Sequence, residues 1–304
     1  MPYPVSRAEE TDLARLIVQL EHPSVRIGSQ VRGAVTVRSD SPIRAGGLRI
    51  ELKAVAKARG VCVEREMSED SYYDYTETSL GKRGFTAAIF KSSETIAGGS
   101  IRPGTHPFSV SIPLDVPPTF SGKALSISWY VEAVIDRPFR RDLRESSQLY
   151  VYPEVPRPEP TTVASTAGEL RLEAVLPATA LTPSLPGLIT VAIGAVKPVR
   201  CKEVAAVLKR VENITYSEPG TTPTSTIACH ADYSEVIHRE VIARNIELGP
   251  DTPLTHQLPI HAPPIPSAET GALKVGLVLQ VMCKKKGFFG GTESVEVLIP
   301  TTPS

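Results

Sequence analysis

The sequence predicts an all-β protein made of two β-sandwich domains in tandem. Three observations lead to this prediction: the turn-rich composition, an internal repeat of strand patterns, and a proline-rich segment near the middle of the chain. The 304 residues include 28 prolines and 21 glycines, whereas only 6% are aromatic. This composition is typical of many short strands joined by turns, and the length suits two domains of about 150 residues each.

The first part of the repeat covers a pair of strands. "LIVQLEHPSVRIGSQVRGAVTV" begins at Leu16, and "LRLEAVLPATALTPSLPGLITV" begins at Leu170. Each stretch reads as a strand, then a turn near Gly28 or Pro183, then a strand that alternates apolar and polar residues. The two halves of the chain therefore begin with the same predicted unit.

The second part of the repeat lies later in each half. "THPFSVSIPLDVPPTFSGKALSISWYVEAVI" starts at Thr105, and "THQLPIHAPPIPSAETGALKVGLVLQVM" starts at Thr255. In both, a strand reaches a double proline, and another long strand follows a turn. Proline ends strand pairing because it has no backbone N–H to donate, so the same strand order is expected twice.

The boundary between the halves is expected in a proline-rich linker. Prolines at 153, 156, 158 and 160 fix the backbone and remove donors, which favours an extended, stiff segment. We therefore predict an N-terminal sandwich at 1–152, a linker at 153–168 and a C-terminal sandwich at 169–304.

One stretch has the apolar spacing of a helix. "KEVAAVLKRVENI" places Val204, Val207, Leu208 and Val211 on one helical face. The matching stretch of the first half, "GGLRIELKAVA", alternates like a strand. The repeat therefore favours a strand in both places.

Charge and hydropathy exclude several classes of protein. The 33 basic and 33 acidic residues give a net charge of zero, whereas a nucleic-acid-binding protein normally carries a basic excess. No stretch approaches the 18 apolar residues of a membrane-spanning helix. The N-terminus has early acidic residues and no uninterrupted apolar core, so no signal peptide is expected.

The cysteines predict a reducing compartment. Cys62, Cys201, Cys229 and Cys283 are scattered, with no CxxC pair and no metal-ligand spacing. They are expected to be small buried thiols in a cytoplasmic protein that could also be peripheral at membranes. No metal and no cofactor are expected.

The stretch from 104 to 142 carries the most specific motif. Phe108, Val110 and Ile112 alternate onto one face of a strand, prolines follow, and Gly122 permits a turn. "GTHPFSVSIPLDVPPTFSG" followed by "ISWYVEAVIDRPFRRD" resembles the N-terminal domain of the arrestin family, and "SVRIGSQVRGAVTV" resembles that family's second strand. The matching positions are Phe108, Pro113, Pro118, Phe120, Tyr130, Val131 and 136–139.

The resemblance implies two immunoglobulin-type β-sandwiches and a non-enzymatic adaptor or scaffold in protein trafficking or signalling. Its partners would be membrane protein tails or sorting and signalling proteins. An alternative is a prokaryotic stress or sporulation-type regulator with the same fold and no trafficking role. A carbohydrate-binding sandwich is disfavoured because the single tryptophan, Trp129, is placed in a core strand. The sequence contains no catalytic-nucleophile, phosphate-loop, zinc or dinucleotide motif, so it does not predict an enzyme.

Two hairpin turns combine cations with phenylalanine and are candidate membrane contacts. Exposed rings could enter the headgroup boundary while the cations meet anionic lipid. Alternatively, the rings fold back onto the sandwich. The residues are Arg137, Phe139, Arg140 and Arg141 in the first turn, and Lys284, Lys285, Lys286, Phe288 and Phe289 in the second.

A further candidate surface combines tyrosines with acids, a composition that suits a protein-binding loop. The alternative is a solvated hairpin extension. The residues are Glu69, Asp70, Tyr72, Tyr73, Asp74 and Tyr75.

Overall fold

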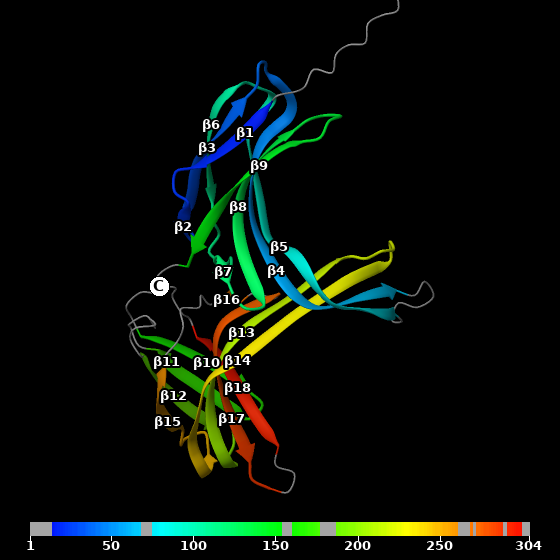
Figure 1. The fold of residues 1–304 in the computed structure, drawn as a ribbon. Helices are drawn as coiled ribbons and strands as arrows, with labels where there is room; N and C mark the ends of the chain where they lie inside the picture. The colour runs from blue at the N-terminus through cyan, green and yellow to red at the C-terminus, as the bar shows by residue number, and fades with distance from the viewer. Residues whose placement is uncertain are drawn as a thin grey trace, which may run out of the picture. The chain divides into compact units, whose positions relative to one another are not determined.

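The computed structural model contains strands and turns only. It describes residues 14–67, 75–153, 160–176, 187–260, 268–269, 272–287 and 291–299, and none of these is helical. Figure 1 shows the strands as arrows. The expected all-β class is confirmed.

Eighteen strands are present in the described residues. They are β1 (Arg15–Leu20), β2 (Ser24–Arg26), β3 (Gln30–Arg38), β4 (Ile43–Met67), β5 (Tyr75–Ile101), β6 (Gly104–Ser111), β7 (Phe120–Ser121), β8 (Leu125–Asp136), β9 (Leu143–Tyr152), β10 (Thr161–Ala167), β11 (Leu170–Leu176), β12 (Gly187–Ala195), β13 (Val199–Pro219), β14 (Ser225–Leu248), β15 (Leu254–Ile260), β16 (Ala268–Glu269), β17 (Leu273–Lys285) and β18 (Thr292–Ile299).

The chain forms two compact units, and some strands contribute to both. The first unit comprises Met1–Val55, Ala88–Leu114 and Ser128–Val151, and the second comprises Ala56–Ala87, Asp115–Ile127 and Tyr152–Ser304. The long strands β4 and β5 and the start of β8 therefore run from one unit into the other.

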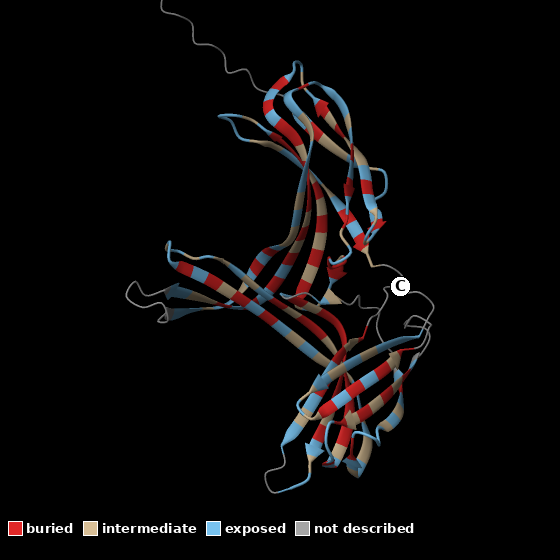
Figure 2. Cartoon of the chain, turned by 180° about the vertical axis from the view of Figure 1, so that it is seen from behind, coloured by how far each residue is buried: buried red, intermediate tan, exposed pale blue. Residues whose placement is uncertain are grey.

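The first unit has two sheets with an apolar interior. One sheet has the order β1-β3-β6, and in the other β4, β8, β9 and β2 are successive neighbours. Trp129, Leu48 and Ile50 are fully buried, and the ring of Phe90 lies 5.4 Å from that of Trp129, centroid to centroid. Buried residues alternate with exposed ones in β6 and with half-buried ones along most of β8 (Figure 2), as expected when one face of each sheet is buried.

The second unit repeats this construction. One sheet has the order β10-β11-β12-β15, and in the other β16, β17, β13 and β14 are successive neighbours, with β18 on β17 and the end of β4 on β14. Leu172, Val191 and Val281 are among its fully buried side chains. The order β11-β12-β15 matches β1-β3-β6 of the first unit, in line with the sequence repeat.

Two segments test expectations from the sequence: one was placed in the linker, and the other has the apolar spacing of a helix. Residues 161–167 were placed in the linker, but they form β10, which pairs with β11 from Thr161↔Leu176 to Ala167↔Leu170. The stretch with helical spacing lies within β13, as the repeat predicted. Pairing with β14 and β17 on its two sides outweighs local propensity there.

The expectation of free thiols is wrong for all four cysteines. Cys62 and Cys229 are directly opposite each other on β4 and β14 and form a disulfide. Cys201 of β13 and Cys283 of β17 form the second. The two cysteines of each disulfide are far apart in sequence. Only the register of the paired strands brings them together, so their sequence spacing could not reveal the pairing.

A buried carboxylate holds the turn that follows the double proline. Glu212 of β13 is fully buried, and its Oε2 accepts hydrogen bonds from the backbone N–H groups of Ala124 (2.7 Å) and Leu125 (3.1 Å). Its Oε1 accepts from the Lys123 N–H (3.0 Å) and from Arg210 Nε (2.7 Å). A Cβ at Gly122 would lie 2.3 Å from Glu212 Oε2, so the turn needs glycine there because of this carboxylate.

We predict that Glu212→Gln destabilises the protein by about 3 kcal/mol, because an amide NH₂ would face backbone donors and Arg210 would lose its counter-charge. Urea unfolding followed by circular dichroism measures the change. Glu235→Gln is the matched control, since Glu235 pairs with Lys123 at the exposed surface. Equal stability of the Glu212 variant and wild type would contradict this account of the turn.

The disulfides predict a second measurable effect. Replacing Cys62 and Cys229 together by serine should cost about 4 kcal/mol, because the bond closes a loop with a sequence separation of 167 residues. Denaturant unfolding checks the loss. Thiol titration of denatured, unreduced protein taken directly from its native cell should find no thiols; four thiols there would restore the sequence-based expectation.

Candidate functional site

The turn between β8 and β9 is closed by an arginine. Arg137 donates from Nε (2.9 Å) and Nη2 (2.6 Å) to the carbonyl oxygen of Arg141, and the Arg140 N–H donates to the Arg137 carbonyl at 3.3 Å. Arg137 therefore shapes the turn, while Arg140 and Arg141 are exposed at its surface.

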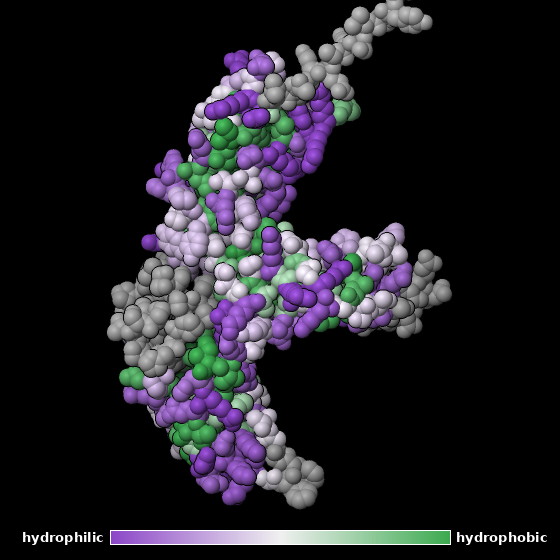
Figure 3. Space-filling model, viewed as in Figure 1, coloured by the Kyte–Doolittle hydropathy of each residue, from purple (hydrophilic) through white to green (hydrophobic). Residues whose placement is uncertain are grey.

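Phe139 at this turn is both fully exposed and in an unusual backbone conformation. It has a φ of 63°, and its side chain is fully exposed to solvent. The left-handed region costs a residue with a Cβ about 1 kcal/mol relative to glycine, and an exposed ring gains nothing from burial. In Figure 3 the end of the β8–β9 hairpin carries apolar surface beside strongly hydrophilic surface. The ring therefore does not pack on the sandwich.

Ion pairs support the base of this turn. Arg49 of β4 reaches Asp136 at 3.2 Å, and Arg144 of β9 reaches Asp142 at 3.1 Å. Desolvation works to raise the pKa of Asp142, but hydrogen bonds from the Arg144 side chain and the Arg137 backbone outweigh it and lower the pKa. Asp142 thus stays ionised and holds both arginines.

The network continues inward to a buried carboxylate on β4. Glu51, only 2% exposed, pairs with Arg49 (3.0 Å) and Lys53 (2.6 Å), and Lys53 also pairs with Glu132 of β8. Burial alone would raise the pKa of Glu51, but hydrogen bonds from Lys53 and Arg49 lower it to about 2. The alternation of charges in "RIELK" was the sequence signal for this network, although it does not show which strand faces β4.

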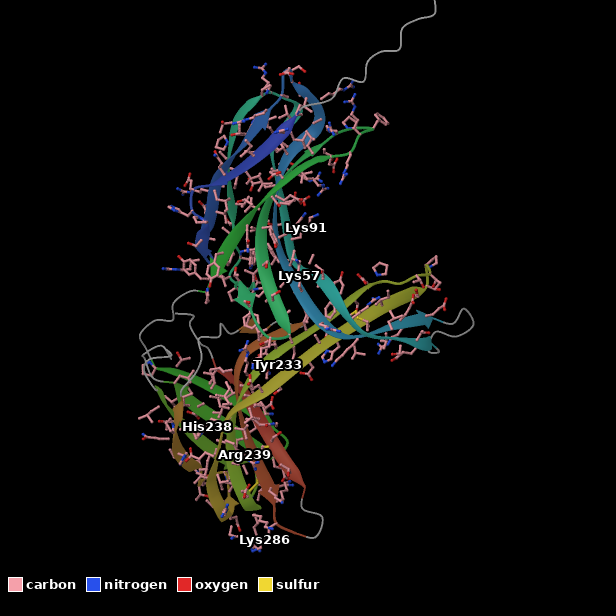
Figure 4. All side chains as sticks on the ribbon, viewed as in Figure 1. Lys57, Lys91, Tyr233, His238, Arg239 and Lys286 are labelled. Carbon is pink, nitrogen blue, oxygen red and sulfur yellow. A yellow bond between two sulfur atoms is a disulfide. The ribbon has the colours of Figure 1, made fainter. Side chains whose placement is uncertain are left out.

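The second turn, between β17 and β18, divides its lysines between two roles. Lys285 Nζ donates to Glu169 (2.8 Å) and Glu293 (2.9 Å), and these hydrogen bonds raise its pKa. Lys284 and Lys286 are exposed and have no ion pair within the described part of the chain. Figure 4 labels Lys286 at this end of the second unit. Phe288 and Phe289 lie outside the described residues.

The tyrosine-rich candidate loop is largely outside the description. Glu69, Asp70, Tyr72, Tyr73 and Asp74 fall between the described residues of β4 and β5, and Tyr75 begins β5. Its role in binding stays a prediction. Across the described residues, no group of three or more histidine, cysteine, aspartate or glutamate side chains is arranged to hold a metal ion.

The fold and these turns define an all-β protein whose candidate contacts lie on exposed hairpin turns. Residues 17–156 match the family described as Arrestin (or S-antigen), N-terminal domain. The expected resemblance is thereby confirmed for residues 17–156, which are similar to this N-terminal domain. The matched region runs from within β1 to the end of β9 and includes both the double-proline turn and the Phe139 turn.

A comparison with curated proteins finds no match. Arrestin-like proteins act in general as non-enzymatic adaptors that bind protein partners. Among the described residues, no helix is long and apolar enough to cross a membrane.

We predict that the Glu51 network stabilises the protein in a defined pH range. Because the folded-state pKa of Glu51 is lowered from 4.5 to about 2, its contribution is complete above pH 4.5 and is lost as pH falls toward 2. After allowance for solvent screening it amounts to about 2 kcal/mol.

Urea unfolding at a series of pH values tests this. Glu51→Gln should flatten the loss of stability between pH 4.5 and 2 and lower stability at pH 7. An unchanged acid limb in the variant would show that other carboxylates govern acid unfolding.

Proposed function

We propose that this protein is an adaptor that contacts an anionic membrane surface through the β8–β9 turn while it binds protein partners. The observation that carries the proposal is Phe139, which combines full exposure with a positive φ. Both features are unfavourable in the isolated protein, and both become useful if the ring inserts at a headgroup boundary.

The charges around the ring support the same partner. Arg140 and Arg141 are exposed beside Phe139, and each cation near an anionic surface contributes on the order of 1 kcal/mol. The overall net charge of zero means that attraction to such a surface must come from local patches. The β17–β18 turn, with Lys284 and Lys286, is the second patch in the proposal.

The proposal extends to trafficking or signalling at the membrane. The competing role is that of a soluble prokaryotic-type regulator with the same fold, which would not need Phe139 exposed. The disulfides argue against a reducing compartment. The thiol titration described above therefore tests the expected cytoplasmic location: free thiols would favour it, and their absence would oppose it.

We predict opposite effects of Phe139→Gly on binding and on stability. Loss of the ring should reduce binding to vesicles of phosphatidylserine and phosphatidylcholine at least fivefold, since burial of an aromatic side chain contributes about 2 kcal/mol. Glycine at a positive φ should leave stability unchanged or raise it by about 1 kcal/mol. Vesicle co-sedimentation and urea unfolding measure the two quantities.

Leu114→Ser is the matched control, because Leu114 is a large apolar residue that is 75% exposed elsewhere in the first unit. It should leave vesicle binding unchanged. Equal vesicle binding by wild type and Phe139→Gly would remove the basis of the proposal. Crosslinked pull-down with both proteins as bait would then identify soluble regulators as the alternative partners.

A further inference from the structure

One side of β14 lacks a strand partner over most of its length. Along one edge β14 pairs with β13 from Thr226 to Leu248, and along the other it pairs with β4 only from Ser225 to His230. Beyond that point no strand within the described ranges pairs with this second edge. β4 leaves β14 at Gly60, where a Cβ would lie 2.1 Å from the His230 carbonyl oxygen.

The direction of the unpaired backbone groups follows from the disulfide pair. Opposite residues of an antiparallel ladder lie about 4.5 Å apart where they do not exchange hydrogen bonds, and about 5.5 Å apart where they do. Cys62 and Cys229 are 4.1 Å apart, Cα to Cα, so Cys229 bonds toward β13. Because backbone direction alternates along a strand, Asp232 and Ser234 direct their N–H and C=O groups to the unpaired edge.

Two arginines on β14 beyond this stretch form a small cationic cluster around one carboxylate. Arg239 and Arg244 share the single carboxylate of Glu203, at 3.5 and 3.8 Å, and their side chains are 56% and 70% exposed. Glu235 and Glu247 each pair with a cation on a neighbouring segment, Lys123 and Arg200 respectively. Glu240 lies within hydrogen-bond distance of His256 on β15. Figure 4 labels Tyr233, His238 and Arg239 along this strand.

Apolar contact is available along the same strand. "EVIHREVIAR" repeats a five-residue pattern, and its valines, Val236 and Val241, are 57% and 39% exposed. The register with β13 shifts between Leu208 and Lys209 and between Val204 and Ala205, so Ile237 and Ile242 are the extra residues of two bulges. Bulges protect an edge from long, indiscriminate pairing, which limits an added strand to short stretches.

From these observations we propose that the unpaired edge of β14, residues 231–244, binds an extended acidic segment of a partner protein. The segment adds as a strand beside 231–236 and places its carboxylates against Arg239 and Arg244. Backbone hydrogen bonds supply affinity in this kind of recognition, and alternate side chains supply specificity. The site differs from the hairpin turns proposed above as membrane contacts.

The test uses the full chain and a synthetic peptide that alternates valine and glutamate, measured by fluorescence anisotropy. The peptide should bind, and its affinity should fall as salt rises. Arg239→Gln combined with Arg244→Gln should weaken binding about tenfold. Arg200→Gln, on β13 and away from the edge, is the matched control and should change binding less than about twofold.

A backbone variant tests the strand addition separately. Ser234→Pro removes an N–H that points to the unpaired edge and not to β13, so it should weaken binding at least tenfold while the unfolding midpoint stays close to wild type. A peptide with lysine in place of glutamate should bind at least tenfold more weakly.

Three results would overturn the proposal. They are no binding of the glutamate peptide up to about 1 mM, equal binding of the lysine and glutamate peptides, and unchanged binding by a folded Ser234→Pro variant. If the arginine double variant lowers vesicle binding and leaves peptide binding unchanged, this edge faces a membrane and the proposal is wrong.

Discussion

The buried carboxylate of Glu212 is the interaction on which the second unit depends most. This unit is assembled from three separate stretches of chain, so it needs contacts that join them. Glu212 of β13 accepts hydrogen bonds from three successive N–H groups of the 123–125 turn. A buried ion with fully satisfied oxygens fixes geometry, because any displacement leaves charge unpaired. Its position therefore determines where the double-proline turn and the start of β8 lie.

The same turn explains why the most recognisable stretch of the sequence is scaffold. Pro117 and Pro118 lie in the irregular segment between β6 and β7, Gly122 leaves room for the carboxylate, and Leu125 begins β8. The strand then carries Trp129 into the core of the first unit and ends at Asp136, where the Phe139 turn begins. A rigid interior contact and an exposed turn are thus connected by one strand, which is how a β-sandwich holds a surface loop in place.

Period-two alternation and proline-marked turns predicted most of the fold. They predicted β6 and β8, because burial of one sheet face imposes alternation. The strand character of β13 was predicted by the internal repeat, against its local helical spacing. The disulfides and the Glu212 turn were missed because each joins residues far apart in the chain. The same holds for the link from Lys53 to Glu132 in the Glu51 network. The candidate turn at Phe139 was found from its composition, but its exposure depends on the Arg137 bonds to Arg141, which composition cannot show.

The exposure and backbone strain of Phe139 bear on function because another residue at this position would remove them. Glycine would remove the cost of a positive φ, and a polar residue would remove the exposed ring, with no loss of packing in either case. The turn keeps its geometry through Arg137, which donates two hydrogen bonds to the carbonyl oxygen of Arg141. Stability of the isolated protein therefore gives no reason for phenylalanine at this position, whereas contact with an apolar phase does.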